Sequence, residues 1–177
     1  MEFTLNSLAK TLGKPIDKDF VRRRKDCFAQ STHDRKKYIT AISLSESSFV
    51  TTLVLNEEAT HLEYLYANGV KKLQKIDFQS FATLKYADLS NCNLAGDVMI
   101  RCTESNLEQI YLHHNKIKSI QFIGNFPKLQ LIDICENQLK SIIFEGHFND
   151  LNYLYLNDNQ LTTIDLSNLK ELKTLHL

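Results

Sequence analysis

One eleven-residue pattern returns along most of the chain, and it constrains the fold more than any other feature. Apolar residues occupy positions 1, 4, 6 and 11 of the pattern, and asparagine occupies position 9 in its clearest copies. The copies begin, in chain order, at Ile39, Leu62, Leu84, Leu107, Leu129, Leu151 and Leu172. These starts are 23, 22, 23, 22, 22 and 21 residues apart. Spacing this regular indicates one supersecondary unit used again and again.

The pattern predicts a short strand and a tight turn in each unit. Alternation at Leu154 and Leu156 places both side chains on one face of a strand. A single strand cannot bury that face alone, so neighbouring units are expected to stack into a parallel sheet over a shared core. The asparagine at position 9 is expected to bond backbone groups of its own turn and of the adjacent unit. Cys92 and Ser47 stand at the same position as weaker substitutes.

The repeats resemble the leucine-rich repeat family in its short, 21–23-residue form, over residues 39–177. The resemblance implies an α/β solenoid, a right-handed superhelix with a curved parallel β-sheet on its concave face. Apolar residues such as Ile142, Phe144 and Phe148 are expected to fill the core from the convex side. Because the chain has only five Gly and two Pro, we expect short strands, 3₁₀ turns and loops on that side rather than long helices.

Residues 1–38 do not repeat, and we predict that they form a helical N-terminal cap on the repeats of 39–177. One helix is expected through Leu5–Leu12 and a second from about Asp17 to Gln30. A cap is needed because the first repeat otherwise exposes its core. The basic run Arg22–Lys25 leaves open a docking patch for an acidic partner, although such a run is usually a solvated helix face.

The charge of the chain is balanced overall but divided between its parts. Lys+Arg and Asp+Glu are both 21, which argues against a general binder of nucleic acid or anionic membranes. Residues 1–38 hold ten basic and five acidic side chains, a net +5, so the repeats carry −5. No nucleic acid and no membrane is therefore expected as a partner.

Compartment and chain ends give further expectations. The sequence shows no apolar signal region and no stretch long enough to cross a bilayer, and its four cysteines lack CxxC spacing. This favours the cytoplasm, while a secreted mature fragment stays an open alternative. Residues 172–177 begin a repeat and stop on its strand, so we expect either a piece of a longer protein or end-to-end self-association through that edge.

Tyrosines gather at the outward positions of the strands. Positions 3, 5, 7 and 8 point away from the core; six of the seven tyrosines fall at positions 3 and 5, and no Lys or Arg occupies any of the four. Tyrosine suits both exposed strands and protein interfaces. The candidate partner-binding residues are Tyr64, Tyr66, Tyr86, Asp88, Tyr111, His113, Asp133, Tyr153 and Tyr155.

Position 5 predicts an alternating row of phenols and carboxylates across neighbouring strands. The row reads Tyr66, Asp88, Tyr111, Asp133, Tyr155. Such a row suits a partner that offers Arg or Lys through ion pairs and cation–π contacts. The alternative is a solvated sheet face with no partner.

Catalytic and metal sites are weakly indicated. His113 and His114 stand beside Cys135 and Glu136 of the next unit, but consecutive residues leaving a strand are expected to diverge, so we predict no metal site. No nucleophile elbow, phosphate loop or zinc-protease motif occurs, and Asp88 and Asp133 lie on an open surface. We therefore expect neither an enzyme nor a cofactor in these residues.

We predict a protein-interaction module that binds a protein or peptide on its acidic, tyrosine-rich concave face. The alternative is the sensing arm of a larger enzyme, such as a Roco-type GTPase, a kinase or a ubiquitin ligase, as the family resemblance implies. A purely structural packing role also stays open.

Overall fold

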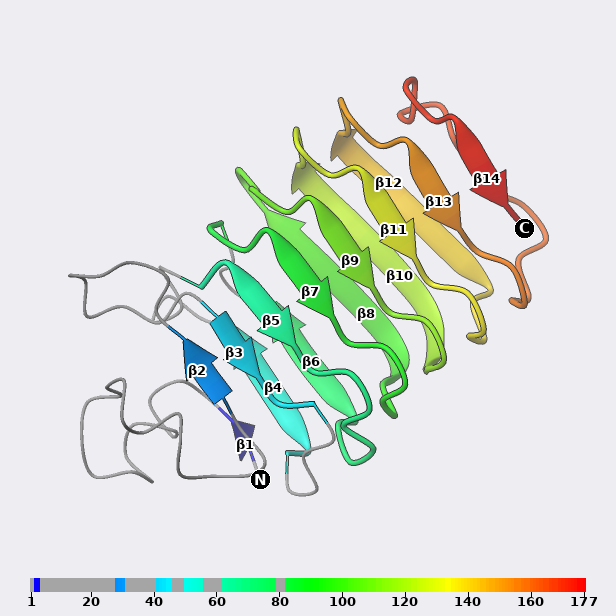
Figure 1. The fold of residues 1–177 in the computed structure, drawn as a ribbon. Helices are drawn as coiled ribbons and strands as arrows, with labels where there is room; N and C mark the ends of the chain where they lie inside the picture. Colours follow the sequence, from blue (N-terminus) through cyan, green and yellow to red (C-terminus); the bar gives the residue numbers. More distant parts are fainter. Residues whose placement is uncertain (1, 4–27, 31–40, 46–49, 56–61, 79–81) are drawn as a thin grey trace.

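The chain folds into stacked coils, most of which add one strand to each of two facing sheets (Figure 1). The computed structural model describes residues 2–3, 28–30, 41–45, 50–55, 62–78 and 82–177. Every regular element in these ranges is a strand. The described part accordingly holds no helix long and apolar enough to span a membrane.

The front sheet, nearest the viewer in Figure 1, consists of three-residue strands. All of them pair in parallel except β2 (Phe28–Gln30), which is antiparallel to its neighbour. Its strands, in spatial order, are β2 (Phe28–Gln30), β3 (Ala41–Ser43), β5 (Tyr64–Tyr66), β7 (Tyr86–Asp88), β9 (Gln109–Tyr111), β11 (Leu131–Asp133), β13 (Tyr153–Tyr155) and β14 (Thr174–His176). The register joins equivalent repeat positions, so that Tyr66 pairs with Asp88 and Asp88 pairs with Tyr111.

The back sheet lies behind the front sheet and is also parallel. Its strands, in spatial order, are β1 (Glu2–Phe3), β4 (Thr52–Leu55), β6 (Lys75–Phe78), β8 (Ala95–Cys102), β10 (Lys116–Asn125) and β12 (Ser141–His147). The three longest, β8, β10 and β12, span eight, ten and seven residues. This side therefore contains strands, as expected, but longer ones than the sequence suggested.

The core lies between the two sheets. The middle residue of each front strand from β3 to β13 is buried, and Leu65, Ile110 and Ile132 are fully buried. From the back come the phenylalanines: the rings of Phe122 and Phe144 stack with centroids 5.7 Å apart. The apolar filling predicted from the second half of each repeat is confirmed at Ile142, Phe144 and Phe148.

Of the α/β solenoid expected from the family resemblance, the described residues show the stacked parallel coils and no helix, and so form a β-solenoid. The reason lies in the second half of each repeat. In β10, buried Ile120 and Phe122 alternate with the more exposed Ser119 and Gln121. A period of two favours an extended strand that covers the core with every second side chain.

The predicted helical N-terminal cap lies mostly outside the described residues, including Leu5–Leu12 and Arg22–Lys25. Its last stretch is corrected: Phe28–Gln30, expected at the end of a helix, forms β2 and pairs antiparallel with β3. A strand here satisfies the backbone groups that the edge of β3 would otherwise leave unpaired.

The asparagine ladder predicted from position 9 is confirmed in the described repeats. Asn115, Asn137 and Asn159 each donate to carbonyls of their own turn and to one carbonyl of the preceding coil. Cys92 takes the place of asparagine in its repeat, and its thiol donates a hydrogen bond of 3.1 Å to the carbonyl of Ala67. Ser47 lies outside the described residues.

Candidate protein-interaction surface

The nine candidate residues share the outer surface of the front sheet, which we call the tyrosine face. It is formed by Tyr64, Tyr66, Tyr86, Asp88, Tyr111, His113, Asp133, Tyr153 and Tyr155. All except His113 belong to strands β5 to β13, and none points into the core. Tyr66 and Tyr153 are the most open, with 40% and 42% of their surface exposed. The sequence therefore placed each of these residues on the correct side of its strand.

The tyrosines do not stand separately. The ring of Tyr86 lies 5.2 Å from that of Tyr66 and 5.6 Å from that of Tyr111, with tilts of 40° and 44°. Tyr111 continues the series to His113 in an edge-on contact at 6.3 Å. These contacts form a connected aromatic strip that zigzags over strands β5, β7 and β9. A separate edge-on contact joins Tyr155 to His176 at 5.1 Å.

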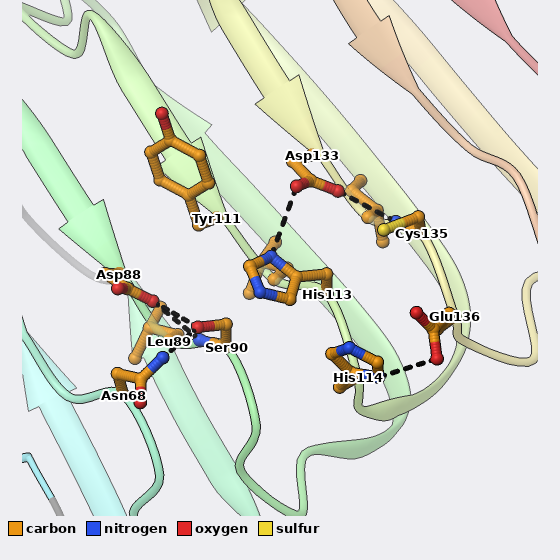
Figure 2. A network of polar contacts seen from close by, with 12 residues as sticks. Asn68, Asp88, Leu89, Ser90, Tyr111, His113, His114, Asp133, Cys135 and Glu136 are labelled. Atoms are coloured by element: carbon orange, nitrogen blue, oxygen red, sulfur yellow. Dashed lines mark hydrogen bonds and ion pairs between the residues drawn. The ribbon is translucent and has the colours of Figure 1, made fainter.

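Asp88 is held in place by the turn that follows its strand (Figure 2). Its Oδ1 accepts hydrogen bonds from the backbone nitrogen and the hydroxyl of Ser90, at 3.0 and 2.5 Å. Ser90 is itself fully buried and accepts a bond of 2.6 Å from the amide of Asn68. The position of the carboxylate on the face is therefore fixed before any partner arrives.

Asp133 is fixed in a similar way. Its Oδ1 accepts a bond of 3.1 Å from the backbone nitrogen of Cys135. Its Oδ2 lies 3.2 Å from Nδ1 of His113, close enough for an ion pair when the imidazole is protonated but not aligned as a hydrogen bond. Asp88 and Asp133 are thus each held by the turn that follows their strand, and they lie two strands apart on the face.

The two neighbouring histidines face different carboxylates, as Figure 2 shows. His113 approaches Asp133, whereas Nδ1 of His114 lies 2.7 Å from Oε2 of Glu136. Among the residues that the structure describes, no group of three His, Cys, Asp or Glu side chains is placed to hold a metal ion. The histidines and carboxylates here instead form separate pairs.

Burial raises the pKa of several ionisable groups on or beside the tyrosine face. It raises the pKa of the Tyr86 phenol to about 12, with a further contribution from the charge of Asp88. The pKa of Tyr111 is raised by burial and by Asp133 and Asp88. Burial, together with a hydrogen bond to Asp133, raises the pKa of the Cys135 thiol to about 12. The phenols therefore offer hydroxyl donors, and the permanent charge of the face comes from carboxylates.

Two features of the face were missed by sequence reasoning. Position 8 of the pattern has a left-handed backbone, with φ between 52° and 58° at Asn91, His114, Glu136 and Asp158. Asn, Asp and His are enriched in this region, which gives a weak signal, but Glu gives none. The second is Ser90, a buried hydroxyl that links two neighbouring turns.

Comparisons with known proteins agree with the coil architecture. The family model described as "Leucine Rich repeats (2 copies)" matches residues 105–146, and the model described as "Leucine Rich Repeat" matches residues 150–172. A Roc-COR-CHAT protease of Runella zeae is 36% identical over 116 residues. The match covers 63% of this chain but only 12% of that protein. No solved structure matches the chain.

Proposed function

This chain is a leucine-rich repeat protein, and we propose that it is an interaction module that binds a protein or peptide on the tyrosine face. The observation that carries the proposal is the connected strip of Tyr66, Tyr86 and Tyr111. Tyrosine brings a large, rigid and amphipathic contact area at a small entropic cost, which makes it a frequent interface anchor. A strip already in contact loses little further freedom on binding.

The charge of the face supports a basic partner. In the described front strands the outward positions hold Asp88 and Asp133 and no Lys or Arg, although the chain has 21 such basic residues. Carboxylates fixed by their turns attract Arg and Lys, and the faces of neighbouring phenols add cation–π contacts. We therefore expect the partner to present arginine or lysine side chains.

A second candidate is that this chain is the repeat arm of a multidomain enzyme. The observation that favours it is the similarity to a Roc-COR-CHAT protease, of which the chain spans about 12%. In that setting the arm would still act by binding, and the chemistry would belong to other domains.

The free thiols of Cys92, Cys102 and Cys135 suit a reducing compartment such as the cytoplasm. The reading frame around the coding sequence of this chain separates the two candidates.

The test of the interaction module uses peptides selected on the immobilised chain from a displayed random library. Replacing Tyr111 and Tyr155 with Ala should weaken the selected peptides by about a hundredfold or more, since anchor residues contribute about 2 kcal/mol each. Because both side chains lie outside the core, thermal unfolding should change little.

The matched control replaces Met99 and Ile143 with Ala. Both are large and exposed, at 48% and 44%, but lie on the back sheet. Peptides selected on the chain should bind this variant as they bind the wild type. Equal binding to the Tyr111→Ala/Tyr155→Ala variant and the wild type would show that the tyrosine face is not the interface.

A further inference from the structure

The two fixed carboxylates of the tyrosine face define a spacing. Asp88 pairs in register with Tyr111, and Tyr111 pairs in register with Asp133, so the carboxylates stand on strands β7 and β11 with β9 between them. Neighbouring strands are about 4.8 Å apart, which puts the two carboxylate positions about 9.6 Å apart across the sheet. The spacing runs perpendicular to the strands, along the stack of coils.

A ligand that lies along the stack must present its cations with the same spacing. A polyproline II helix has three residues per turn and rises about 3.1 Å per residue, so residues i and i+3 lie on one side about 9.3 Å apart. An extended β-strand repeats on one side at about 6.7 Å or about 13 Å, and neither value matches. Two turns of an α-helix rise about 10.8 Å, which matches the carboxylate spacing less well, and an α-helix is itself about 10 Å wide.

The aromatic strip provides the second half of the argument. The rings of Tyr66, Tyr86 and Tyr111 are tilted by 40° and 44° against their neighbours rather than stacked flat, so they form one uneven aromatic surface. Aromatic rings arranged side by side form the surfaces on which proline-rich segments dock. Proline rings can pack on these phenols while cations reach the carboxylates.

Hydrogen bonding agrees with the same ligand. A polyproline II backbone makes no internal hydrogen bonds, so its carbonyl groups are free to accept from a partner. The hydroxyl of Tyr86 stays protonated at physiological pH and is a suitable donor. The hydroxyl of Tyr111 already donates to Oε1 of Gln109 at 3.2 Å, which fixes the orientation of that ring.

We propose that the tyrosine face binds a basic polyproline II segment whose arginine or lysine residues at i and i+3 meet Asp88 and Asp133. The segment crosses β7, β9 and β11 along the stack of coils, and its proline rings contact Tyr86 and Tyr111. This inference rests on the proposed function and adds the conformation and the charge spacing of the ligand.

The experiment measures fluorescence anisotropy of labelled nine-residue peptides with the full 177-residue chain. The first peptide is three repeats of Arg-Pro-Pro. A second has the same composition with its three arginines consecutive, and a third replaces the prolines by Gly and Ser at the original arginine spacing. The first peptide should bind at least tenfold more tightly than each of the others.

Variants of the carboxylates test the register. Asp88→Asn and Asp133→Asn retain the oxygen that accepts from the turns at Ser90 and Cys135, so the fold is expected to stay intact. Each should weaken the Arg-Pro-Pro peptide about threefold to tenfold. Glu145→Gln removes one negative charge from the exposed back sheet and should change nothing.

The outcomes separate this inference from the proposed function. Equal binding of the spaced and the consecutive arginine peptides would show attraction by charge alone and overturn the inference. The inference would also be overturned if the library peptides depended on Tyr111 but lacked basic residues at i and i+3, or if they bound as helices. The proposed function would stand in either case. A library that yields no peptide dependent on the tyrosine face would overturn both.

Discussion

The side-chain amide of Asn137 donates a hydrogen bond of 2.9 Å to the carbonyl of Leu112, a residue of the preceding coil. Its Oδ1 accepts a bond of 3.0 Å from the backbone nitrogen of Ile117, which belongs to the same preceding coil. Asn115 and Asn159 make equivalent pairs of bonds. Each of these asparagines therefore completes the turn of the coil before its own.

Replacing Asn137 by Ala should lower the free energy of unfolding by about 2–4 kcal/mol, because buried carbonyl and amide groups lose their partner. Urea unfolding followed by circular dichroism measures the change. Asn157→Ala is the matched control, since the amide of Asn157 reaches only exposed Asp158, and it should cost less than about 0.5 kcal/mol. Similar losses in both variants would mean that the ladder does not stabilise the stack.

Glycine 124 occupies a position that no other residue can fill. Its φ is +125°, and a Cβ built there would lie 1.8 Å from the carbonyl oxygen of Cys102 on the neighbouring strand. Gly124→Ala should therefore destabilise the chain by about 3 kcal/mol or more. Gly96 has a φ of +78° but nothing within 4 Å of its Cβ position. Gly96→Ala should cost only about 1 kcal/mol in the same urea titration, and an equal cost would contradict the close approach at Gly124.

The Tyr86 phenol should ionise at a higher pH than an ordinary tyrosine. The folded pKa, about 12, lies above the ordinary value of 10, so burial of the neutral phenol stabilises the fold fully below pH 10. That contribution is lost as pH rises from about 10 through about 12. Absorbance at 295 nm should show a phenol that ionises near pH 12 and is missing in Tyr86→Phe. A difference titration between wild type and variant centred at pH 10 would refute the assignment.

Cys135 should react slowly with iodoacetamide at pH 8. Its pKa of about 12 instead of 9 lowers the thiolate fraction by two to three orders of magnitude relative to the unfolded chain. Asp133→Asn removes the negative charge that helps to raise this pKa, so labelling should become about tenfold faster. Peptide-resolved mass spectrometry follows the site directly. Labelling unaffected by Asp133→Asn would show that Asp133 does not help to raise the pKa of this thiol.

The front sheet and its ladder could be predicted from the sequence because one period sets both. A spacing of 21 to 23 residues puts Tyr66, Asp88 and Tyr111 at the same position of successive units, and the register pairs them directly. Likewise, position 9 always follows the strand by the same number of residues. Residues at equivalent positions of successive units therefore take equivalent places along one repeated backbone path.

The back sheet and the first residues were harder to predict. In β10 an extra residue shifts the register against β8 between Ile117 and Ser119, which no pattern in a single unit announces. Phe28–Gln30 reads as part of a helix because its neighbours are helix formers, yet pairing with the open edge of β3 decides the outcome. The ring contacts of the tyrosine face also depend on side-chain rotamers, which spacing does not set.

The asparagine ladder gives the stack a direction. Asn115 bonds the carbonyl of Leu89 and the amide of Leu94, so the asparagine side chain of one coil completes the turn of the coil before it. In the opposite sense, each turn gives the coil before it a backbone bond, such as that from the nitrogen of Lys116 to the carbonyl of Leu94. Melting that begins at the C-terminal coil removes all the asparagine bonds of the turn before it, whereas melting from the other end leaves the asparagines bonded within their own turns. The described repeats are therefore coupled asymmetrically, and their opening is expected to travel more readily toward the N-terminus than toward the C-terminus.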